Sequence, residues 1–350
     1  MSDRVNDSKN SGASRGAGST GGTVLKIENL HVSFGEGETR ARAVRGIDLE
    51  IHRGELHALV GESGSGKTVT STCVLGLLPT PPAIIEAGSI YYKGHDHEGD
   101  LLQFSEDKRR RTRGREIAMV FQEPGKYLNP ALRVGEQIME MLRLHLGFRG
   151  EAAEQRALEI LETVGLGGNR RVLRSFPHEL SGGMKQRVMI AIAICCNPSL
   201  LIADEPTTAL DVTLQMQILK LIMQLRHKFD MGILFISHDL AVVHDIADRV
   251  SVIYAGKIVE SGSRDEIFNS PQHPYTRLLL ASVPDAAKRG KKLVTISGKV
   301  PDAEHFPTGC AFHPRCPLAE KRCADEQPPA EKLDGSRSAS CFCLGKEWPA

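Results

Sequence analysis

Apolar residues follow strand-like patterns through the N-terminal part of the chain. Residues 24–34 alternate between apolar and polar with a period of two, which predicts a strand, and residues 43–51 form a second strand after a polar turn. Residues 56–60 form a short apolar run that predicts a buried strand, and residues 69–78 have the pattern of a helix. Residues 89–94 predict a further strand and turn.

The rest of the chain alternates buried strands with helices. The predicted strands are residues 117–121, 200–205 and 232–237, with a hairpin formed by residues 250–254 and 257–260. The predicted helices are residues 134–146, 151–164, 188–196 and 215–227, with a further helical segment near Phe176. This alternation indicates an α/β fold with a mixed core sheet and a helical insertion.

Charge and composition exclude several classes of protein. The chain has 44 basic and 43 acidic residues, so no polycationic surface indicates a nucleic-acid partner. No apolar run reaches the roughly 18 residues that cross a bilayer, and the N-terminus lacks the apolar core of a secretory signal. Residues 1–23 are instead rich in Gly, Ser, Asn and charge, which predicts a disordered tail. We expect a cytosolic protein that would rely on another chain for any membrane span.

A Gly-rich stretch between the predicted strand 56–60 and the predicted helix 69–78 matches the pattern G-x-x-x-x-G-K-[ST]. Its glycines let backbone N–H groups wrap a phosphate chain at a helix N-terminus. Lys67 would place its charge on the terminal phosphates, and the Thr68 hydroxyl suits Mg²⁺. The strand–loop–helix context favours this interpretation over a chance Gly/Ser-rich turn. The predicted nucleotide-binding residues are Gly61, Ser63, Gly64, Ser65, Gly66, Lys67 and Thr68.

Two carboxylates end the apolar strand at residues 200–205. In P-loop proteins the acid at the end of such a strand holds Mg²⁺, which suits Asp204, and Glu205 lies where a base could orient water. The alternative is a pair of surface acids. His238 follows the strand 232–237 at the sheet edge where sites of α/β proteins collect, although a lone histidine is usually structural.

Three further features have both a functional and a structural interpretation. Residues 181–183 (Ser-Gly-Gly) open a predicted helix, where free N–H groups and the helix dipole favour an anion. Phe34, upstream of the Gly-rich loop, could stack on a nucleotide base or pack in a core. The basic run over residues 107–115 could contact phosphates or a partner, but a solvated surface is the simpler interpretation.

Taken in order, these motifs resemble the nucleotide-binding subunit of an ATP-binding-cassette (ABC) transporter over residues 25–268. Residues 180–186 are similar to the signature motif that distinguishes this superfamily from other P-loop proteins. The resemblance makes Phe34 the adenine-stacking aromatic and Gln122 a sensor of Mg²⁺ and the γ-phosphate. It implies ATP and Mg²⁺ as ligands, and a P-loop NTPase fold with a helical signature subdomain near residues 123–196.

The resemblance also implies a mechanism shared between two cassettes. Two such domains pack head to tail, so Ser181 and Gly183 would act on the partner's nucleotide. Residues 209–211 would form the family's D-loop, which ends at Asp211. Glu205 would activate water for attack on the γ-phosphate, and His238 would bridge that phosphate and the Glu205 region. Closure of the dimer would drive a membrane partner.

C-terminal residues narrow the resemblance. Residues 273–279 (HPYTRLL) and the cysteine-containing residues 309–323 resemble the C-terminal region of dipeptide and oligopeptide importer ATPases, and residues 121–124 and 128–130 fit the same group. Members handle dipeptides, oligopeptides, nickel or glutathione. The resemblance implies a second ATPase subunit in a heterodimer, two transmembrane permease subunits, an extracytoplasmic binding protein and a peripheral place on the cytoplasmic face of the membrane. Residues 125–127 (GKY) depart from the usual Met-Thr-Ser in a segment that faces the membrane subunits.

Five of the eight cysteines crowd into the C-terminal region with the spacing C-x5-C-x6-C-x17-C-x-C. In a cytosolic chain such a cluster favours metal over disulfides, and four thiolates suit a [4Fe–4S] cluster or Zn²⁺. The resemblance implies a [4Fe–4S] cluster with the ligands Cys310, Cys316, Cys323 and Cys341. Cys343 would then be a spare thiol that is not a ligand. The alternatives are a zinc site that uses His313 and an unmetallated set of thiols.

Two other classes of ATPase are alternatives. Soluble ABC ATPases of DNA repair or translation usually carry two cassettes or long insertions, whereas this chain has one P-loop, one signature and no long heptad run. A generic P-loop kinase or GTPase does not explain the signature and the Asp-Glu pair. We therefore expect an ABC nucleotide-binding domain over residues 24–268 and a small cysteine-rich extension over residues 269–350.

Overall fold

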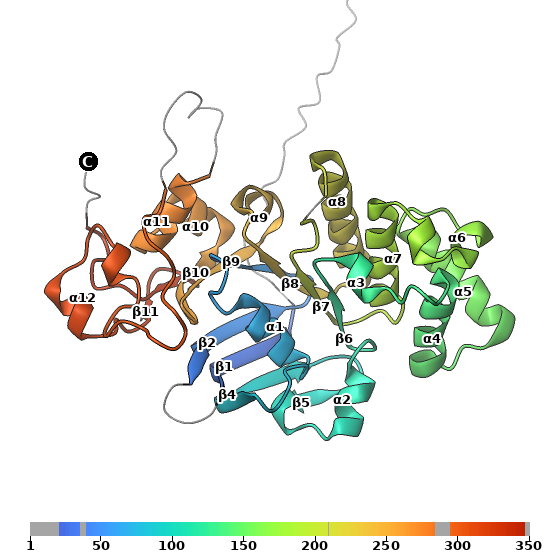
Figure 1. The fold of residues 1–350 in the computed structure, drawn as a ribbon, viewed down its shortest axis with the longest axis horizontal. Coiled ribbons are helices and arrows are strands. Elements are labelled where there is room, and N and C mark those ends of the chain that lie inside the picture. The colour runs from blue at the N-terminus through green and yellow to red at the C-terminus, as the bar shows by residue number, and fades with distance from the viewer. Residues whose placement is uncertain (1–20, 36–39, 209, 284–294, 347–350) are drawn as a thin grey trace, which may run out of the picture.

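The computed structural model describes residues 21–35, 40–208, 210–283 and 295–346. The predicted tail lies outside these ranges up to residue 20. Within them, the strands form one sheet of eight strands and one of four, with helices packed around both (Figure 1). The α/β fold expected from the sequence is confirmed.

The larger sheet holds the core of the molecule. In chain order its strands are β3 (Leu56–Val60), β6 (Ile117–Val120), β7 (Leu200–Asp204), β8 (Gly232–Ser237), β9 (Arg249–Tyr254), β10 (Lys257–Ser263), β11 (Glu331–Lys332) and β12 (Ser338–Ala339). Their order in space is β11-β12-β10-β9-β3-β8-β7-β6. From β9 to β6 neighbouring strands run parallel, and β10 runs antiparallel to β9, so the sheet is mixed as expected. β3, β7 and β8 are buried along their whole length, which is typical of parallel strands covered on both faces.

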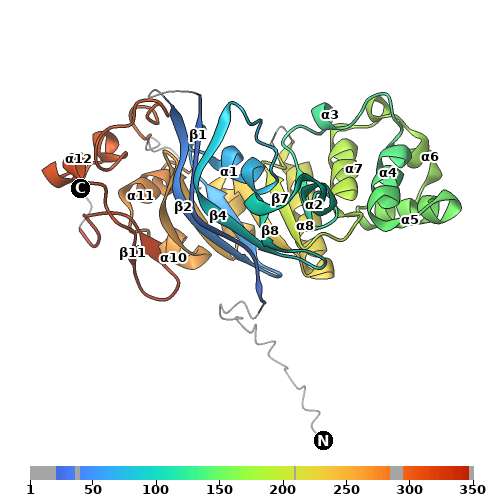
Figure 2. The same cartoon turned by 90° about the horizontal axis from the view of Figure 1, so that it is seen from below.

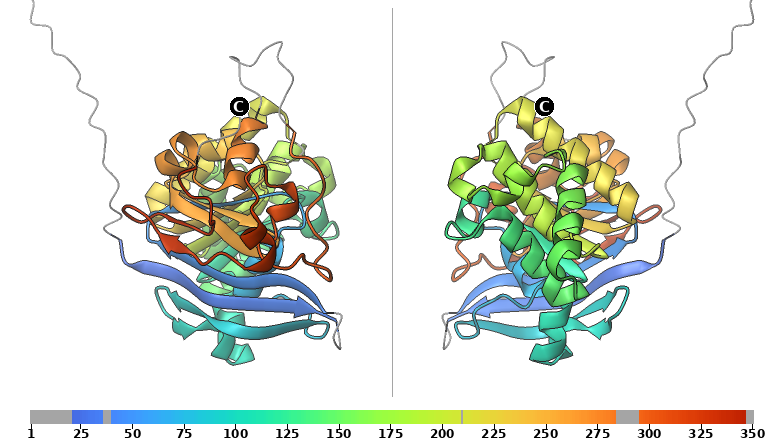
Figure 3. Two further views of the ribbon diagram at one scale, coloured as in Figure 1. Left: turned by 90° about the vertical axis from the view of Figure 1, so that its left-hand side faces the viewer. Right: turned by 90° about the vertical axis from the view of Figure 1, so that its right-hand side faces the viewer.

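The smaller, antiparallel sheet runs along one side of the molecule, where Figure 3 shows its strands in blue and cyan. It consists of β1 (Thr23–Phe34), β2 (Ala41–His52), β4 (Ala83–Lys93) and β5 (Glu98–Asp100), in the order β2-β1-β4-β5. Ile27 and Ile47 from this sheet share a buried cluster with Leu59 and Ile236 from the larger sheet. Helix α1 (Lys67–Val74) contacts both β2 and β7, so it lies between the two sheets.

The helices that follow β6 form a group at one end of the molecule (Figures 1 and 2). They are α3 (Pro124–Tyr127), α4 (Val134–Leu146), α5 (Gly150–Thr163), α6 (Arg170–Arg174), the 3₁₀ helix η2 (Pro177–Glu179) and α7 (Gly182–Ile194). Apolar residues at helical spacing, such as Ile138 and Leu142 of α4, bury the inner face of the group. α7 joins the group to the core, because it contacts β6 and α8 (Val212–Phe229).

The helices α7 and α8 begin earlier than the apolar pattern predicted. At the start of α7 the Ser181 side chain accepts a hydrogen bond from the N–H of Met184. At the start of α8 the Asp211 side chain accepts one from the N–H of Leu214, at 2.9 Å. Such caps stabilise a first helical turn through polar side chains, so apolar periodicity does not reveal that turn.

The remaining helices of the cassette are η1 (Leu101–Gln103), α2 (Glu106–Thr112) and α9 (Leu240–Ile246). In the parts of the chain that the structure describes, no helix combines the length and the apolar content that crossing a bilayer requires.

The C-terminal region is continuous with the main core. Its helices are α10 (Arg264–Asn269), α11 (Pro274–Ala281), η4 (His313–Arg315) and α12 (Lys321–Asp325). Tyr275 and Phe312 belong to the same buried cluster as Tyr254 of β9, and β12 pairs with β10 to extend the larger sheet. The C-terminal region therefore packs against the core of the cassette through Tyr275 and Phe312, whereas Cys323, Cys341 and Cys343 form a small buried cluster of their own. The boundary of the extension at residue 269 stays a prediction.

Candidate active site

The Gly-rich stretch forms the loop between β3 and α1, at the carboxyl edge of the larger sheet. Gly64 and Gly66 have positive φ angles of 77° and 104°, a conformation that favours glycine. A Cβ atom at Gly66 would lie 2.6 Å from the carbonyl oxygen of Ala43. The loop therefore needs glycine both for its turn and for close packing against neighbouring backbone.

Lys67 begins α1, and its side chain folds back into the loop. Its ammonium donates hydrogen bonds to the carbonyl oxygens of Gly61 and Glu62, at 2.8 and 2.9 Å. Burial lowers the pKa of Lys67, although the carboxylates of Glu205 and Asp204 oppose this shift. The cation is thus held inside the loop, close to the two acids that follow each other at the end of β7.

The loop opens on a pocket of about 560 Å³, large enough for a nucleotide-sized ligand. Its lining residues are Ala43, Ser63, Gly64, Gly66, Lys67, Thr68, Val69, Gln122, Asp204, Glu205, His238 and Ala303. Most of the predicted site residues therefore meet in one place, although they come from the ends of different elements. Gly61 and Ser65 are buried in the same loop.

The end of β7 brings a carboxylate to the first turn of α1. Asp204 is 8% exposed and shares a side-chain hydrogen bond with Thr68. Burial raises the pKa of Asp204, and this outweighs the opposing effects of Thr68 and Lys67. Carboxylate and hydroxyl oxygens are the hard ligands that Mg²⁺ prefers. The two residues therefore fit the predicted Mg²⁺ site.

Three side chains hold Glu205 at the end of β7. Its Oε1 lies 2.9 Å from Nδ1 of His238, and its Oε2 accepts hydrogen bonds from Nε2 of Gln122 at 3.0 Å and from the hydroxyl of Thr208 at 3.1 Å. Its φ angle of 47° is left-handed, an uncommon conformation for a residue other than glycine that concentrates at functional sites. The carboxylate is thus fixed beside the pocket, as a general base requires.

The signature residues lie away from the pocket of their own chain. Ser181 is exposed, and neither Ser181 nor Gly183 is among the described residues that line the pocket around the P-loop. A Cβ atom at Gly183 would lie 2.6 Å from the Leu214 side chain, so α7 and α8 approach closely here. Nε2 of Gln186 donates to the carbonyl oxygen of Pro206 at 2.6 Å, which links the signature helix to the acid pair.

Two other predicted residues also lie outside the lining of this pocket. Phe34 ends β1, where it is half-buried and packs against the cluster between the two sheets. Asp211 is exposed and caps α8. Residue 209, which belongs to the predicted D-loop, lies outside the described residues. The roles of Phe34 and Asp211 toward a nucleotide therefore stay predictions.

Sequence reasoning missed several residues of the site. Thr208 lies in the loop that follows β7, and its hydroxyl donates a hydrogen bond to Glu205. Its position three residues after Glu205 is the sequence feature that could have identified it. Ala303 lines the pocket from the C-terminal region, because the N–H of Arg42 donates to its carbonyl oxygen at 2.9 Å. No local motif indicates Ala303, since this contact joins residues that are far apart in the chain.

All five C-terminal cysteines line one narrow pocket of about 10 Å³, together with Phe312 and other residues of the core. Cys323, Cys341 and Cys343 are buried, and burial raises the pKa of Cys316 and Cys341 to about 11. The N–H of Cys343, the residue predicted to be spare, donates to the sulfur of Cys341 at 3.2 Å. Cys343 thus lies within the same group of thiols.

Of the residues whose positions are described, no three or more His, Cys, Asp or Glu side chains are spaced to hold one metal ion. His313 lines the thiol pocket, but its Nδ1 lies 2.9 Å from the carbonyl oxygen of Cys310, which takes up one ring nitrogen. This contact leaves Nε2 of His313 able to coordinate a metal, so the zinc alternative stays a prediction.

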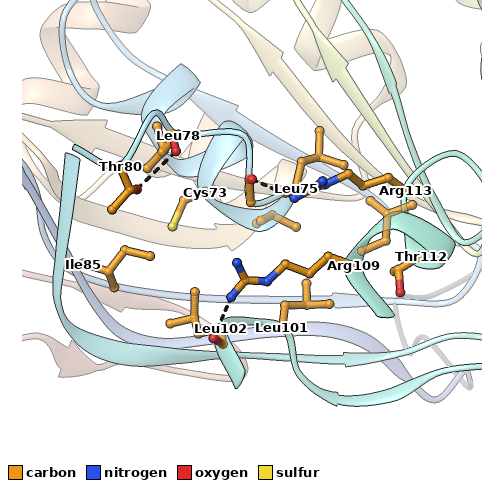
Figure 4. A pocket seen from close by; sticks show the side chains of 13 residues that line it. Cys73, Leu75, Leu78, Thr80, Ile85, Leu101, Leu102, Arg109, Thr112 and Arg113 are labelled. Atoms are coloured by element: carbon orange, nitrogen blue, oxygen red, sulfur yellow. Dashed lines mark hydrogen bonds between the residues drawn. The ribbon is translucent and has the colours of Figure 1, made fainter. Parts of the chain in front are cut away.

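A second pocket lies between α1, β4 and α2, and it is lined mainly by apolar side chains (Figure 4). Two arginines of the basic run face it. Arg109 donates to the carbonyl oxygen of Leu102 at 2.8 Å, and Arg113 to that of Leu75 at 2.7 Å. The run is therefore not simply a solvated surface, because these arginines tie α2 to η1 and to the end of α1. Their donors serve the fold, and we assign no ligand to this pocket.

The segment that departs from the usual Met-Thr-Ser forms α3. The Tyr127 ring stacks on the Phe121 ring, with centroids 3.8 Å apart and planes inclined by 8°. Tyr127 is 56% exposed, so a rigid aromatic pair stands at the surface next to Gln122.

Comparisons with protein families match two parts of the chain. Residues 44–208 match the family described as ABC transporter, and residues 259–323 match the oligopeptide/dipeptide transporter, C-terminal region. The oligopeptide transport ATP-binding protein AppD of Bacillus subtilis (strain 168) is 46% identical over 325 residues, which are 93% of this chain and 98% of that protein. The dipeptide transport ATP-binding protein DppD of Escherichia coli (strain K12) is 44% identical over 318 residues, which are 91% and 96% of the two chains.

Solved structures share the fold. A dimeric ATP-binding cassette in a post-hydrolysis state, bound to ADP and Pi, has a TM-score of 0.58 and 28% identity, and covers 69% of this chain and 98% of that one. A component of an ABC transporter complex from Clostridium perfringens has a TM-score of 0.59 and 27% identity, and covers 71% and 91% of the two chains.

Proposed function

Because this chain belongs to the family of ATP-binding subunits of oligopeptide and dipeptide ABC transporters, we propose that its P-loop pocket hydrolyses MgATP to power import of di- or oligopeptides. The chain is an ABC-type transport ATPase. Relatives named as transport ATPases align with 93% and 91% of its length, which argues against a role in DNA repair or translation.

One observation carries the proposal: the fixed carboxylate of Glu205 lines the same pocket as Lys67 and Asp204. The oxygen of a water molecule attacks the γ-phosphorus, and Glu205 takes the proton that this water loses. The bond between the γ-phosphorus and the bridging oxygen breaks, and ADP leaves with the electron pair. Lys67 donates to the phosphate oxygens, and His238 orients Glu205 and donates to the γ-phosphate.

Asp204 and Thr68 would hold Mg²⁺, with Gln122 close to them in the same pocket. The bound ion would neutralise charge that develops on the phosphate oxygens. Lys67 would exchange the carbonyl oxygens of the P-loop for phosphate oxygens. The remaining work of this site is to position groups and to exclude bulk water.

The ATP site is half of a shared site. Ser181 and Gly183 lie outside their own pocket, which fits a signature that acts on the nucleotide of a second ATPase subunit in a heterodimer. Similarity to a cassette that forms a dimer with ADP and Pi supports this arrangement. Phe34 and Asp211 would join the nucleotide when the two cassettes close.

The whole transporter needs further chains. Two permease subunits would cross the membrane, and an extracytoplasmic binding protein would deliver the peptide to them. This chain would then lie peripherally on the cytoplasmic face. The surface that we assign to permease contact is the exposed Tyr127 ring, which stacks on the partly buried Phe121. Phe121 precedes Gln122, so this surface can respond to the nucleotide state of the pocket.

The thiol pocket would hold a [4Fe–4S] cluster on Cys310, Cys316, Cys323 and Cys341. One observation supports this: all five thiols line one largely apolar pocket. When bound, the cluster would cross-link the C-terminal region, and binding would release the thiol protons.

Reconstitution tests the proposed transport. The chain is combined with a partner ATPase, permeases and a binding protein in liposomes, and uptake of a labelled di- or oligopeptide is measured with and without ATP. ATP-dependent uptake that Lys67→Ala abolishes supports the proposal. ATP hydrolysis that drives uptake of nickel but of no peptide contradicts the assigned substrate.

A further inference from the structure

Arg315, in the C-terminal region, forms a bidentate ion pair with Glu62 of the P-loop. Its Nη1 lies 3.0 Å from Oε1 of Glu62, and its Nη2 lies 3.1 Å from Oε2. The Arg315 side chain is 5% exposed and that of Glu62 is 28% exposed, so the pair is largely shielded from water. Paired bonds of this kind fix geometry as well as adding energy.

The Arg315 guanidinium is itself held from other directions. Its Nε donates to the carbonyl oxygen of Ser297 at 2.8 Å, and its Nη1 donates to the Tyr254 hydroxyl at 3.2 Å. The guanidinium carbon lies 5.7 Å from the centre of the Tyr254 ring and 5.9 Å from that of Phe312. Both rings belong to the buried core, so Arg315 is rigidly placed before it reaches the P-loop.

The backbone of Glu62 is engaged as firmly as its side chain. Its N–H donates to the Tyr275 hydroxyl at 3.0 Å, and its carbonyl oxygen accepts from Lys67 at 2.9 Å. Tyr275 and Arg315 both belong to the C-terminal region. Glu62 is thus bonded by two groups from outside the P-loop, and within the loop by the N–H of Ser65 and by the lysine that would bind phosphate.

We propose that Arg315 is a positioning residue for the nucleotide site, which acts through Glu62 on the P-loop backbone and on Lys67. This rests on the proposed binding of ATP at the P-loop. With Arg315 in place, the Glu62 carbonyl holds the Lys67 ammonium at the loop, and the loop keeps the curvature that the phosphates require. Without it, the Glu62 carboxylate loses a shielded partner and the loop samples other conformations.

The main test measures MgATP affinity of the full chain by displacement of a fluorescent ATP analogue. Arg315→Ala is expected to weaken binding about tenfold, the range for loss of a bond between charged groups. In the assembled ATPase it should raise KM about tenfold and change kcat less than about twofold, because the base at Glu205 is untouched. Arg315→Lys keeps the positive charge but cannot form the bidentate bond, so its affinity for MgATP should lie between those of Arg315→Ala and the unaltered chain.

Arg322→Ala is the matched control. Arg322 lies on α12 of the same region and pairs with Glu326, but its side chain is 59% exposed. Its removal should leave ATP affinity unchanged. An equal loss in Arg322→Ala and Arg315→Ala would show that the region responds to any change of charge, and would overturn the specific role of Arg315.

A double-mutant cycle with Glu62→Gln tests the contact from the side of the P-loop, with the C-terminal region intact. Glu62→Gln should weaken binding about as much as Arg315→Ala, and the double variant no more than either alone. If the fold-losses in affinity of the two single variants multiply in the double variant, the residues act independently and the proposal is overturned. If Arg315→Ala does not fold, the affinity of Glu62→Gln alone tests the contact. If the unaltered chain does not bind ATP, the proposed function itself is wrong. If the unaltered chain and both single variants bind ATP equally well, only the role of Arg315 is wrong.

Discussion

Nδ1 of His238 lies 2.9 Å from Oε1 of Glu205, although the two residues follow different strands. β7 and β8 are parallel neighbours, and their register pairs Asp204 with Ile236. The residues just beyond both strand ends therefore meet at one edge of the sheet. His238 is 60% exposed and Glu205 is 18% exposed, so the histidine stands between the carboxylate and solvent.

His238→Ala should lower kcat about 100-fold, because Glu205 loses the group that orients it and the γ-phosphate loses a donor. ATP affinity should change by less than about threefold, since the P-loop is untouched. Steady-state hydrolysis and equilibrium binding measure the two effects. His244→Ala is the control, because His244 is also a half-exposed histidine but lies on α9 outside the pocket. An unchanged kcat in His238→Ala would contradict the assigned role.

MgATP affinity should fall as the pH falls, and it should begin to fall at a higher pH than an ordinary aspartate would allow. Burial raises the pKa of Asp204, and only its ionised form is a good Mg²⁺ ligand. Binding is measured between about pH 8 and about pH 5, with Mg²⁺ and with EDTA. The Mg²⁺-dependent part should decline with acid in the unaltered chain and should be small at every pH in Asp204→Asn. A pH-independent Mg²⁺ effect would contradict the prediction.

Protein produced and purified without oxygen should contain about four irons per chain and absorb broadly in the visible range. Cys323→Ser should lose most of this iron, because Cys323 is buried in the thiol pocket. Cys73→Ser should keep it, since Cys73 lies in the separate pocket of Figure 4. Zinc in place of iron, or iron that Cys323→Ser retains, would contradict the proposed cluster.

Phe312→Ala should lower the free energy of unfolding by about 3–5 kcal/mol, the cost of removing a large side chain from a packed core. Phe312 is 1% exposed and packs on Tyr254 and Tyr275. Denaturant unfolding of the whole chain measures the loss. Leu144→Ala, at a position 69% exposed on α4, should change stability by less than about 0.5 kcal/mol. A small loss in Phe312→Ala would mean that the C-terminal region does not share the main core.

Local motifs predicted the parts of the site whose residues are close in sequence. The P-loop from Gly61 to Thr68 and the acid pair after β7 lie in one pocket because strand ends of a parallel sheet share an edge. The Ser-Gly-Gly motif indicated the start of α7, whereas the start of α8 was missed because Asp211 caps a first turn that has no apolar pattern.

Long-range contacts were beyond the reach of such motifs. The pairs Arg315–Glu62 and Arg42–Ala303 join the C-terminal region to the nucleotide pocket, and no spacing within either segment indicates its partner. The packing of the C-terminal region against the core depends in the same way on Phe312, whose partner Tyr254 lies far from it in the sequence. Sequence patterns describe the elements, and only their packing shows which elements meet.

Hydrolysis by the Glu205→Gln variant tests the central claim most directly. Glutamine keeps the shape of the side chain but cannot accept the proton of the attacking water. The account predicts that MgATP binds at least as well as in the unaltered chain, that hydrolysis in the assembled ATPase falls by a factor of about 100 or more, and that the ATPase dimer stays closed on ATP. Turnover at the unaltered rate would contradict the assignment of Glu205 as the base.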